Sequence, residues 1–150
     1  MQNKSGIFIA FDYGLAQIGV AVAESVTASA RGLTILKAKD GVPNWDAIKA
    51  LLQEWQPVRV VVGLPLNMDG SQSEMAVRAE KFARRLHGRF GVEVELYDER
   101  LSSFEARQLR EERLQNERGG EMRGYMQTPA ENKIDAIAAA VILQGWLDQK

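Results

Sequence analysis

The sequence predicts one α/β domain whose five-stranded mixed sheet carries helices on both faces. Three apolar segments rich in β-branched residues come first, and their short connections indicate an antiparallel meander. Two further strands alternate with helical segments, which is typical of parallel strands joined by helices. A length of 150 residues fits a single domain with a sizeable core, and no second domain is expected.

The meander comprises segments 6–12, 18–24 and 31–37, with Gly14 and Gly32 at expected turns or bulges. Asn44 then offers an N-cap to a helix that Pro57 ends. The remaining expected elements are a strand at 58–64, a loop at 67–71, a helix ended by Gly88 and Gly91, a strand at 92–97, and helices at 102–114 and 130–147.

The composition points to carboxylate chemistry. The chain has no cysteine and one histidine, which excludes thiolate zinc sites and thiol nucleophiles and argues against imidazole-rich metal sites. Any bound metal should therefore be a hard cation such as Mg²⁺ or Mn²⁺. A net charge of -1 argues against coating nucleic acid through bulk charge. Without a membrane-spanning apolar stretch or a signal peptide, we expect a cytoplasmic protein and no membrane partner.

Three acids lie where hydrophobic elements meet turns. Asp12 closes the first strand, Glu99 follows the fifth, and Asp135 opens an apolar helix, where a buried carboxylate would be costly unless a cation met it. If the two strands are neighbours, the three carboxylates meet at one end of the sheet. Two divalent ions about 3.5–4 Å apart in such a cluster can serve an in-line displacement at phosphorus.

Each acid also has a simpler interpretation. Asp12 can be a turn former, and Glu99 can form a surface ion pair with Arg100. The neighbouring Asp98 is an alternative to Glu99 as the ligand. Asp135 can simply favour the start of a helix through the macrodipole.

The helical spacing places Asp135 on one stripe with Ala139, Ile142 and Trp146. Such an apolar stripe would aim the carboxylate at the sheet. Trp146, close to the C-terminus, is alternatively a residue exposed at an interface.

Two further features suit phosphate binding. The loop at 64–70 leaves an expected parallel strand and enters a helix, so its amides and Ser71 could hold a phosphate, although a turn with an N-cap explains it equally well. A stripe on the following helix could follow a nucleic-acid backbone or be only a solvated face. It consists of Arg78, Lys81, Arg85 and Arg89.

Four motifs occur in order along nearly the whole chain: FDYG (11–14) with IGVA (18–21), VGLPLNMDGS (62–71), DERLSS (98–103) with EA (105–106), and IDA (134–136) with AA (138–139). In these motifs the chain resembles the YqgF/RuvX family, described as Holliday junction resolvases or as nucleases that process pre-16S rRNA. The resemblance implies a ribonuclease H-like fold and phosphodiester cleavage dependent on Mg²⁺ or Mn²⁺.

The resemblance also implies that Asp12, Glu99 and Asp135 are the catalytic and metal-binding acids, and it favours Glu99 over Asp98. One departure concerns Gln17, which stands where the family usually has a basic residue. A phosphate contact is then missing or comes from other cations. The residues that we expect to contact substrate are Gly14, Asn67, Gly70, Ser71, Arg100, Ser102 and Lys133.

We therefore expect a metal-dependent endo- or exonuclease that processes the 5′ end of pre-16S rRNA during ribosome biogenesis. Its partners would be nucleic acid, either structured RNA or branched DNA, and ribosomal precursor particles. One alternative is a Holliday junction resolvase. A resolvase needs a homodimer, whereas the rRNA nuclease can be a monomer or a dimer. Another is a nucleic-acid-binding assembly factor that does not cut. RNA versus DNA, the preferred metal and the oligomeric state stay open.

Overall fold

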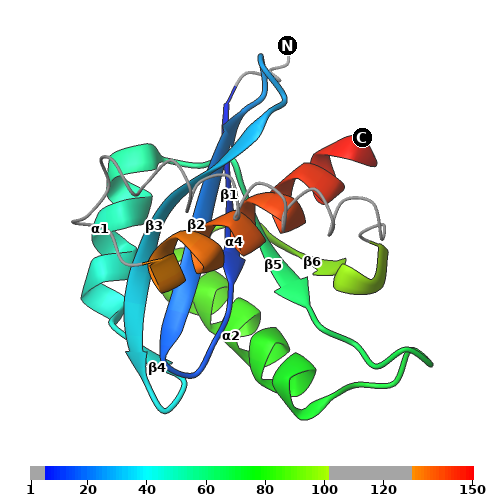
Figure 1. The fold of residues 1–150 in the computed structure, drawn as a ribbon. Coiled ribbons are helices and arrows are strands. Elements are labelled where there is room, and N and C mark those ends of the chain that lie inside the picture. Colours follow the sequence, from blue (N-terminus) through cyan, green and yellow to red (C-terminus); the bar gives the residue numbers. More distant parts are fainter. Residues whose placement is uncertain (1–5, 102–129) are drawn as a thin grey trace.

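A six-stranded mixed sheet forms the centre of the molecule (Figure 1). This computed structural model describes residues 6–101 and 130–150, and the side chains of the second range from residue 136 onward. The strands are β1 (Ile7–Asp12), β2 (Gln17–Glu24), β3 (Ala30–Lys39), β4 (Val42–Pro43), β5 (Arg59–Leu64) and β6 (Val94–Asp98). The helices are α1 (Trp45–Trp55), α2 (Glu74–Phe90), the short 3-10 helix η1 (Glu99–Leu101) and α4 (Ala130–Asp148). The helix expected at 102–114 lies outside the described residues.

The strand order is β4-β3-β2-β1-β5-β6. Strands β1, β2 and β3 form the expected antiparallel meander, and β5 and β6 run parallel to β1. The prediction of five strands missed β4, which pairs with the end of β3. Two residues are too short to show a period of two, and one of them is a proline, which a sheet tolerates at its edge. The parallel arrangement brings the carboxyl ends of β1, β5 and β6 to the same end of the sheet.

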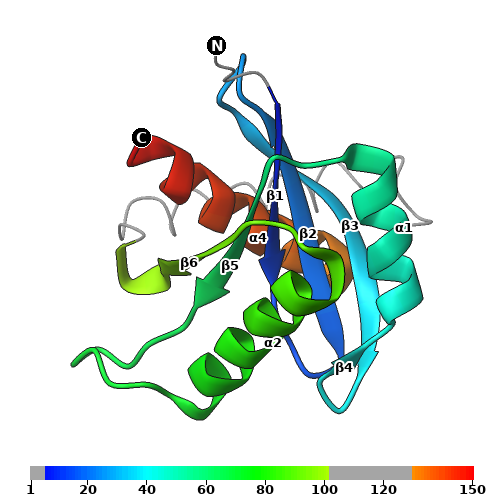
Figure 2. The same ribbon diagram turned by 180° about the vertical axis from the view of Figure 1, so that it is seen from behind.

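Each face of the sheet has its own hydrophobic core. Because side chains alternate along a strand, Phe11 faces α1 and α2, whereas its neighbour Ala10 faces α4. Phe82 and Leu86 of α2 are buried on the first face, and Leu143 of α4 is buried on the second. Figures 1 and 2 show α4 on one side of the sheet and α1 and α2 on the other. The prediction of helices on both faces is therefore confirmed.

Helix α4 crosses the sheet diagonally from β3 to β6. At its start, Ala136 packs so closely on Gly32 that a Cβ built on this glycine would lie 2.8 Å from the alanine Cβ. Near its end, Gly145 packs against the ring of Tyr97 on β6. Trp146 is 5% exposed and its indole N–H donates to Glu95 at 2.9 Å, so the interpretation of Trp146 as an exposed interface residue was wrong.

The helix ends follow the local sequence signals. The side chain of Asn44 accepts a hydrogen bond from the Ala47 N–H, which confirms the predicted N-cap of α1. Gly91 ends α2 in a left-handed conformation with φ of 69°, but Gly88 lies inside the helix, which is longer than expected. Over the described ranges, none of the helices combines the length and apolarity needed to cross a membrane.

Candidate active site

Two of the three candidate acids meet at one end of the sheet. Asp12 is the last residue of β1, and Phe11 pairs with Val62, so Gly63 of β5 comes next to Asp12. Gly63 in turn pairs with Tyr97 of β6, two residues before Glu99. Asp12, at the end of β1, and Glu99, directly after β6, therefore lie on either side of Gly63.

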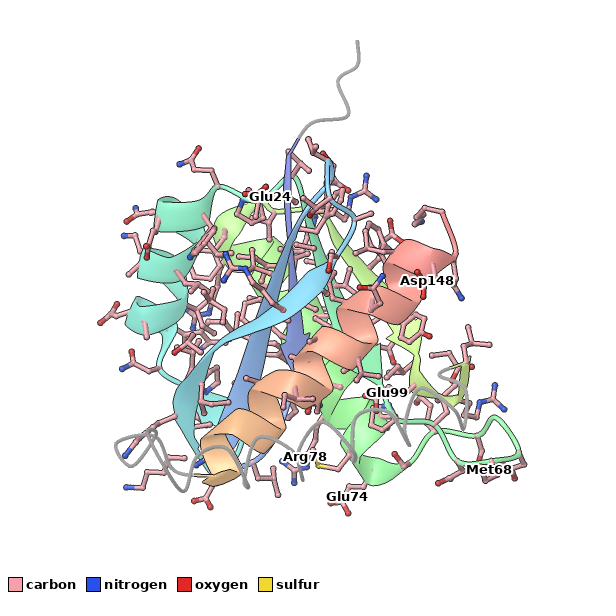
Figure 3. The ribbon with its side chains drawn as sticks, turned by 45° about the horizontal axis from the view of Figure 1, so that its top comes forward. Glu24, Met68, Glu74, Arg78, Glu99 and Asp148 are labelled. Carbon is pink, nitrogen blue, oxygen red and sulfur yellow. The ribbon has the colours of Figure 1, made fainter. Side chains whose placement is uncertain are left out.

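Gly63 makes room for the Glu99 carboxylate. A Cβ built at Gly63 would lie 2.5 Å from Oε2 of Glu99 and 2.6 Å from Cδ1 of Ile142. The carboxylate thus occupies the space over β5 on the face that α4 covers, and Figure 3 shows Glu99 beside this helix. Any side chain at position 63 would displace either the carboxylate or the helix side chain.

The neighbouring Asp98 has a different environment. Its Oδ1 accepts a hydrogen bond from the backbone N–H of Arg100 at 2.9 Å, and its Oδ2 accepts one from Nη2 of Arg100 at 2.8 Å. These side-chain hydrogen bonds with Arg100 lower the pKa of Asp98 and raise that of the guanidinium. The two adjacent acids are thereby separated: Asp98 holds Arg100, and Glu99 lies over Gly63 on the same face as α4.

Arg100 connects this site to the loop between β5 and α2. Its Nη1 donates to the carbonyl of Met68 at 3.1 Å, and the guanidinium lies next to Gly70, which has φ of 90°. Of the expected substrate-binding residues, Gly70 and Arg100 are therefore brought together. The guanidinium already makes internal hydrogen bonds, so it organises the loop in this conformation.

Within the loop, Asn67 donates to Ser71 Oγ at 3.0 Å, and Ser71 Oγ donates to Asp69 at 2.6 Å. The hydrogen bonds from Ser71 lower the pKa of Asp69. Asp69 was not among the expected site residues, although an Asp two residues before a Ser is a typical turn signal. The N-cap of α2 is Ser73, which accepts the Ala76 N–H at 3.0 Å.

The other expected residues have separate outcomes. Gly14 lies in the β1–β2 connection, where a Cβ would come 2.5 Å from the carbonyl of Gln17, so the tight hairpin itself requires this glycine. Ser102 lies outside the described residues. Lys133 and Asp135 belong to the first turns of α4, and their side chains likewise lie outside the description. The stripe predicted for α4 is buried at its three described positions, which are Ala139, Ile142 and Trp146.

The donor set fits a hard divalent cation. Asp12 and Glu99 supply carboxylate oxygens at one end of the sheet, and the glycine between them lets the Glu99 carboxylate lie over β5. Among the described side chains, no group of three histidines, cysteines or acids is close enough to hold a metal. The third expected ligand, Asp135, lies beyond those side chains.

The family model for RuvX, described as a Holliday junction resolvase, matches residues 6–149. The chain belongs to the RuvX family. RuvX is a nuclease family, and the resemblance inferred from the four motifs is thereby confirmed.

Curated relatives match almost their whole length. A protein of Pseudomonas fluorescens strain Pf-5 is 57% identical over 143 residues, which cover 95% of this chain and 92% of the relative. A protein of Azotobacter vinelandii is 51% identical over 96% of this chain and 94% of its own length. Both are named "Putative pre-16S rRNA nuclease".

Solved structures share the fold. Thermus thermophilus RuvC in complex with a Holliday junction substrate matches with a TM-score of 0.55 and 19% identity, over 93% of this chain and 91% of that chain. A second structure of Thermus thermophilus RuvC matches with a TM-score of 0.51 and 16% identity, over 95% of each chain. At these identities the likeness shows the fold, and it confirms the expected ribonuclease H-like architecture.

Proposed function

We propose that this chain hydrolyses phosphodiester bonds with Mg²⁺ or Mn²⁺ at the end of the sheet where β1, β5 and β6 finish. The observation that carries the proposal is the approach of Asp12 and Glu99 to Gly63 from both sides. The acids expected to hold the metal are Asp12, Glu99 and Asp135. When bound, such ions lower the pKa of the attacking water and stabilise the leaving oxygen.

Different residues at this site would bind the cation and position the loop. The carboxylates of Asp12 and Glu99 would hold the cation at this end of the sheet. Arg100 holds the β5–α2 loop against η1 through Asp98 and Met68. This arrangement presents the loop, with Asn67 and Ser71, to the phosphates that flank the cleaved bond.

We propose the 5′ end of pre-16S rRNA as the substrate, in ribosomal precursor particles of the cytoplasm. The names of curated relatives that are more than half identical support this choice. A second candidate is a four-way DNA junction, which the description of the family favours. A junction has two symmetric cleavage points and therefore requires a homodimer, whereas rRNA processing requires only one active site.

The test compares cleavage of labelled pre-16S rRNA, unstructured RNA and a four-way DNA junction, each with Mg²⁺, Mn²⁺ or EDTA. Asp12→Asn and Glu99→Gln should each abolish metal-dependent cutting, while Glu54→Gln on α1 serves as a matched control that should cut normally. Mn²⁺ binding should weaken in both site variants. Equal cutting by Asp12→Asn would exclude the carboxylate site. No cutting of any substrate by the unaltered protein would favour an assembly factor that binds without cleaving.

A further inference from the structure

We propose that a groove between α2, the β3–β4 turn and the start of α1 binds the phosphates of an unpaired nucleic-acid strand next to the cleavage site. The inference rests on the proposed nuclease function and adds the path of the substrate. The groove has a volume of about 600 Å³. Its charged wall comes from α2, and its floor contains Tyr13, Trp45 and Phe82.

The groove begins one residue from a candidate catalytic acid, because Tyr13 directly follows Asp12. The hydroxyl of Tyr13 donates to the carbonyl of Gly41, and the N–H of Gly41 donates to the carbonyl of Leu15 at 2.8 Å. The turn that forms one wall is therefore fixed to the end of β1. Figure 3 shows Arg78, from the groove, at the same end of the molecule as Glu99. The candidate acid Glu99 lies on the face that α4 covers, whereas the groove lies on the α2 face, so a strand that leaves the acids reaches the groove by passing around this end of the sheet.

Three exposed cations line one wall. Arg78, Lys81 and Arg85 follow each other at helical spacing on α2 and all border the groove. Arg78 pairs with Glu74 at 3.6 Å, but this ion pair is exposed and of little energetic weight. Over the described residues, Lys81 and Arg85 have no ion-pair partner. The acids Asp40 and Glu74 also line the groove, so three cations face two acids there, in a chain whose net charge is -1.

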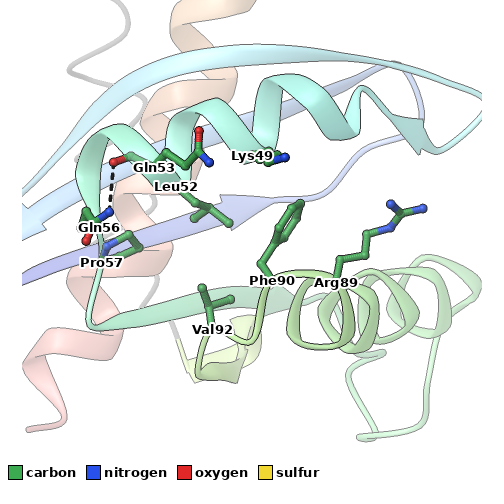
Figure 4. A pocket seen from close by; sticks show the side chains of 8 residues that line it. All are labelled: Lys49, Leu52, Gln53, Gln56, Pro57, Arg89, Phe90 and Val92. Carbon is green, nitrogen blue, oxygen red and sulfur yellow. Dashed lines mark hydrogen bonds between the residues drawn. The ribbon is translucent and has the colours of Figure 1, made fainter.

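Arg89, the fourth cation of the predicted stripe, contacts Trp45 and does not line the groove. The guanidinium of Arg89 lies over the ring of Trp45, 4.2 Å from its centroid, and borders a neighbouring pocket of about 420 Å³ (Figure 4). That pocket reaches Pro57, just before β5 begins, and so lies toward the opposite end of the sheet. The stripe is therefore divided: three cations face the groove near the acids, and Arg89 fixes Trp45.

The shape and floor of the groove favour one strand bound through its backbone. A volume of about 600 Å³ is in the range of small-molecule sites, so the groove can hold nucleotides of one strand but is too small to enclose both strands of a duplex. Trp45 is packed on Phe82 and covered by Arg89, so it forms a rigid part of the floor and is not available for stacking on bases. Recognition should therefore depend on phosphates and be largely independent of sequence.

The test measures binding in the Asp12→Asn background with EDTA, so that no substrate is cut. A fluorescent single-stranded RNA and the same sequence as a duplex are titrated at several salt concentrations. Each lost phosphate contact should reduce the slope of log K against log salt concentration by about 0.7, so Lys81→Gln/Arg85→Gln should reduce it by about 1.4 for the single strand. This change corresponds to roughly 25-fold weaker binding at 0.1 M salt. The matched control is Arg84→Gln/Lys49→Gln, which removes two exposed cations outside the groove and should leave the slope unchanged.

Each outcome is decisive. An unchanged slope in the groove variant, an equal loss in the control, or no RNA binding at all would overturn the proposal. An equal effect on the duplex would overturn its restriction to unpaired strands. Cleavage by the unaltered protein is measured separately: binding that depends on Lys81 and Arg85 without any cleavage would retain the groove and reject the nuclease. Cleavage by the unaltered protein, together with normal RNA binding by the groove variant, would retain the nuclease and reject the groove.

Discussion

The carboxylate of Glu99 occupies the space that a side chain at Gly63 would fill, with Oε2 2.5 Å from the position of a built Cβ. Gly63 lies on β5, and Glu99 directly follows β6, so the register between these strands fixes the contact. A glycine in the middle of a sheet normally weakens it, because it leaves nothing to pack. Here the missing side chain creates the position of a candidate metal ligand.

Gly63→Ala should reduce cleavage much more than it reduces stability. The atoms that the new methyl group would meet are the ends of two flexible side chains, Glu99 and Ile142, so the fold can adjust at a cost of about 1 kcal/mol. The adjustment moves the Glu99 carboxylate, and we expect at least a tenfold loss of cleavage and weaker Mn²⁺ binding. Urea unfolding alongside activity measures both effects. Normal activity with lower stability would show that the position of Glu99 is not critical.

Asp98→Asn and Glu99→Gln should differ although the residues are adjacent. Glu99→Gln removes an expected metal ligand and should abolish cleavage, whereas Asp98→Asn only loosens the hold on Arg100 and should raise KM several-fold. Arg100→Gln should reproduce the effect of Asp98→Asn, and the double variant should be no worse than either single one. Steady-state kinetics of the four variants tests this pattern. A complete loss of activity in Asp98→Asn would reverse the assignment of the ligand.

The Glu95 carboxylate should make stability depend on pH. Burial raises its pKa, but the hydrogen bond from Trp146 and the charges of Lys150 and Arg59 outweigh this effect and lower the pKa below the ordinary value of a glutamate. A lowered pKa in the folded state means stabilisation that is present above the unfolded value and lost as pH falls through the folded value. Glu95→Gln should therefore cost about 1 kcal/mol at pH 7, after allowance for solvent screening, and nearly nothing near pH 3. Equal losses of unfolding free energy at both pH values would contradict the ionic origin.

Gly145→Ala and Gly88→Ala should shift stability in opposite directions. In a helix, Ala is favoured over Gly by roughly 1 kcal/mol. At Gly88 a Cβ would meet nothing within 4 Å, so the full gain should appear. At Gly145 a Cβ would lie 2.7 Å from Cζ of the Tyr97 ring, and overpacking of about 1–3 kcal/mol should outweigh the gain. Urea midpoints compare the two, and stabilisation by both would show that α4 can move away from β6.

The sequence by itself determined the order and type of most elements and the chemistry of the site. Alternating and helical spacing of apolar residues directly reflects which faces are buried, so the meander, the parallel strands and the buried stripe of α4 were predictable. The absence of cysteine left carboxylates as the metal-binding chemistry, and four motifs identified the family. The two-residue β4 was not predictable, because it is too short to have a periodic signal. Helical spacing placed Trp146 on the buried stripe, and only its position near the C-terminus suggested exposure instead.

The tertiary structure decided which residues meet. Local spacing alone does not separate Asp98 from Glu99, although the family resemblance favours Glu99. Asp98 binds Arg100 two residues away, and the pairing of β6 with β5 brings Glu99 over Gly63. Likewise, the four cations of α2 form one stripe in the sequence, but Trp45, from a different helix, takes Arg89 and leaves three at the groove. Contacts between distant segments depend on strand register and helix packing, which local spacing does not encode.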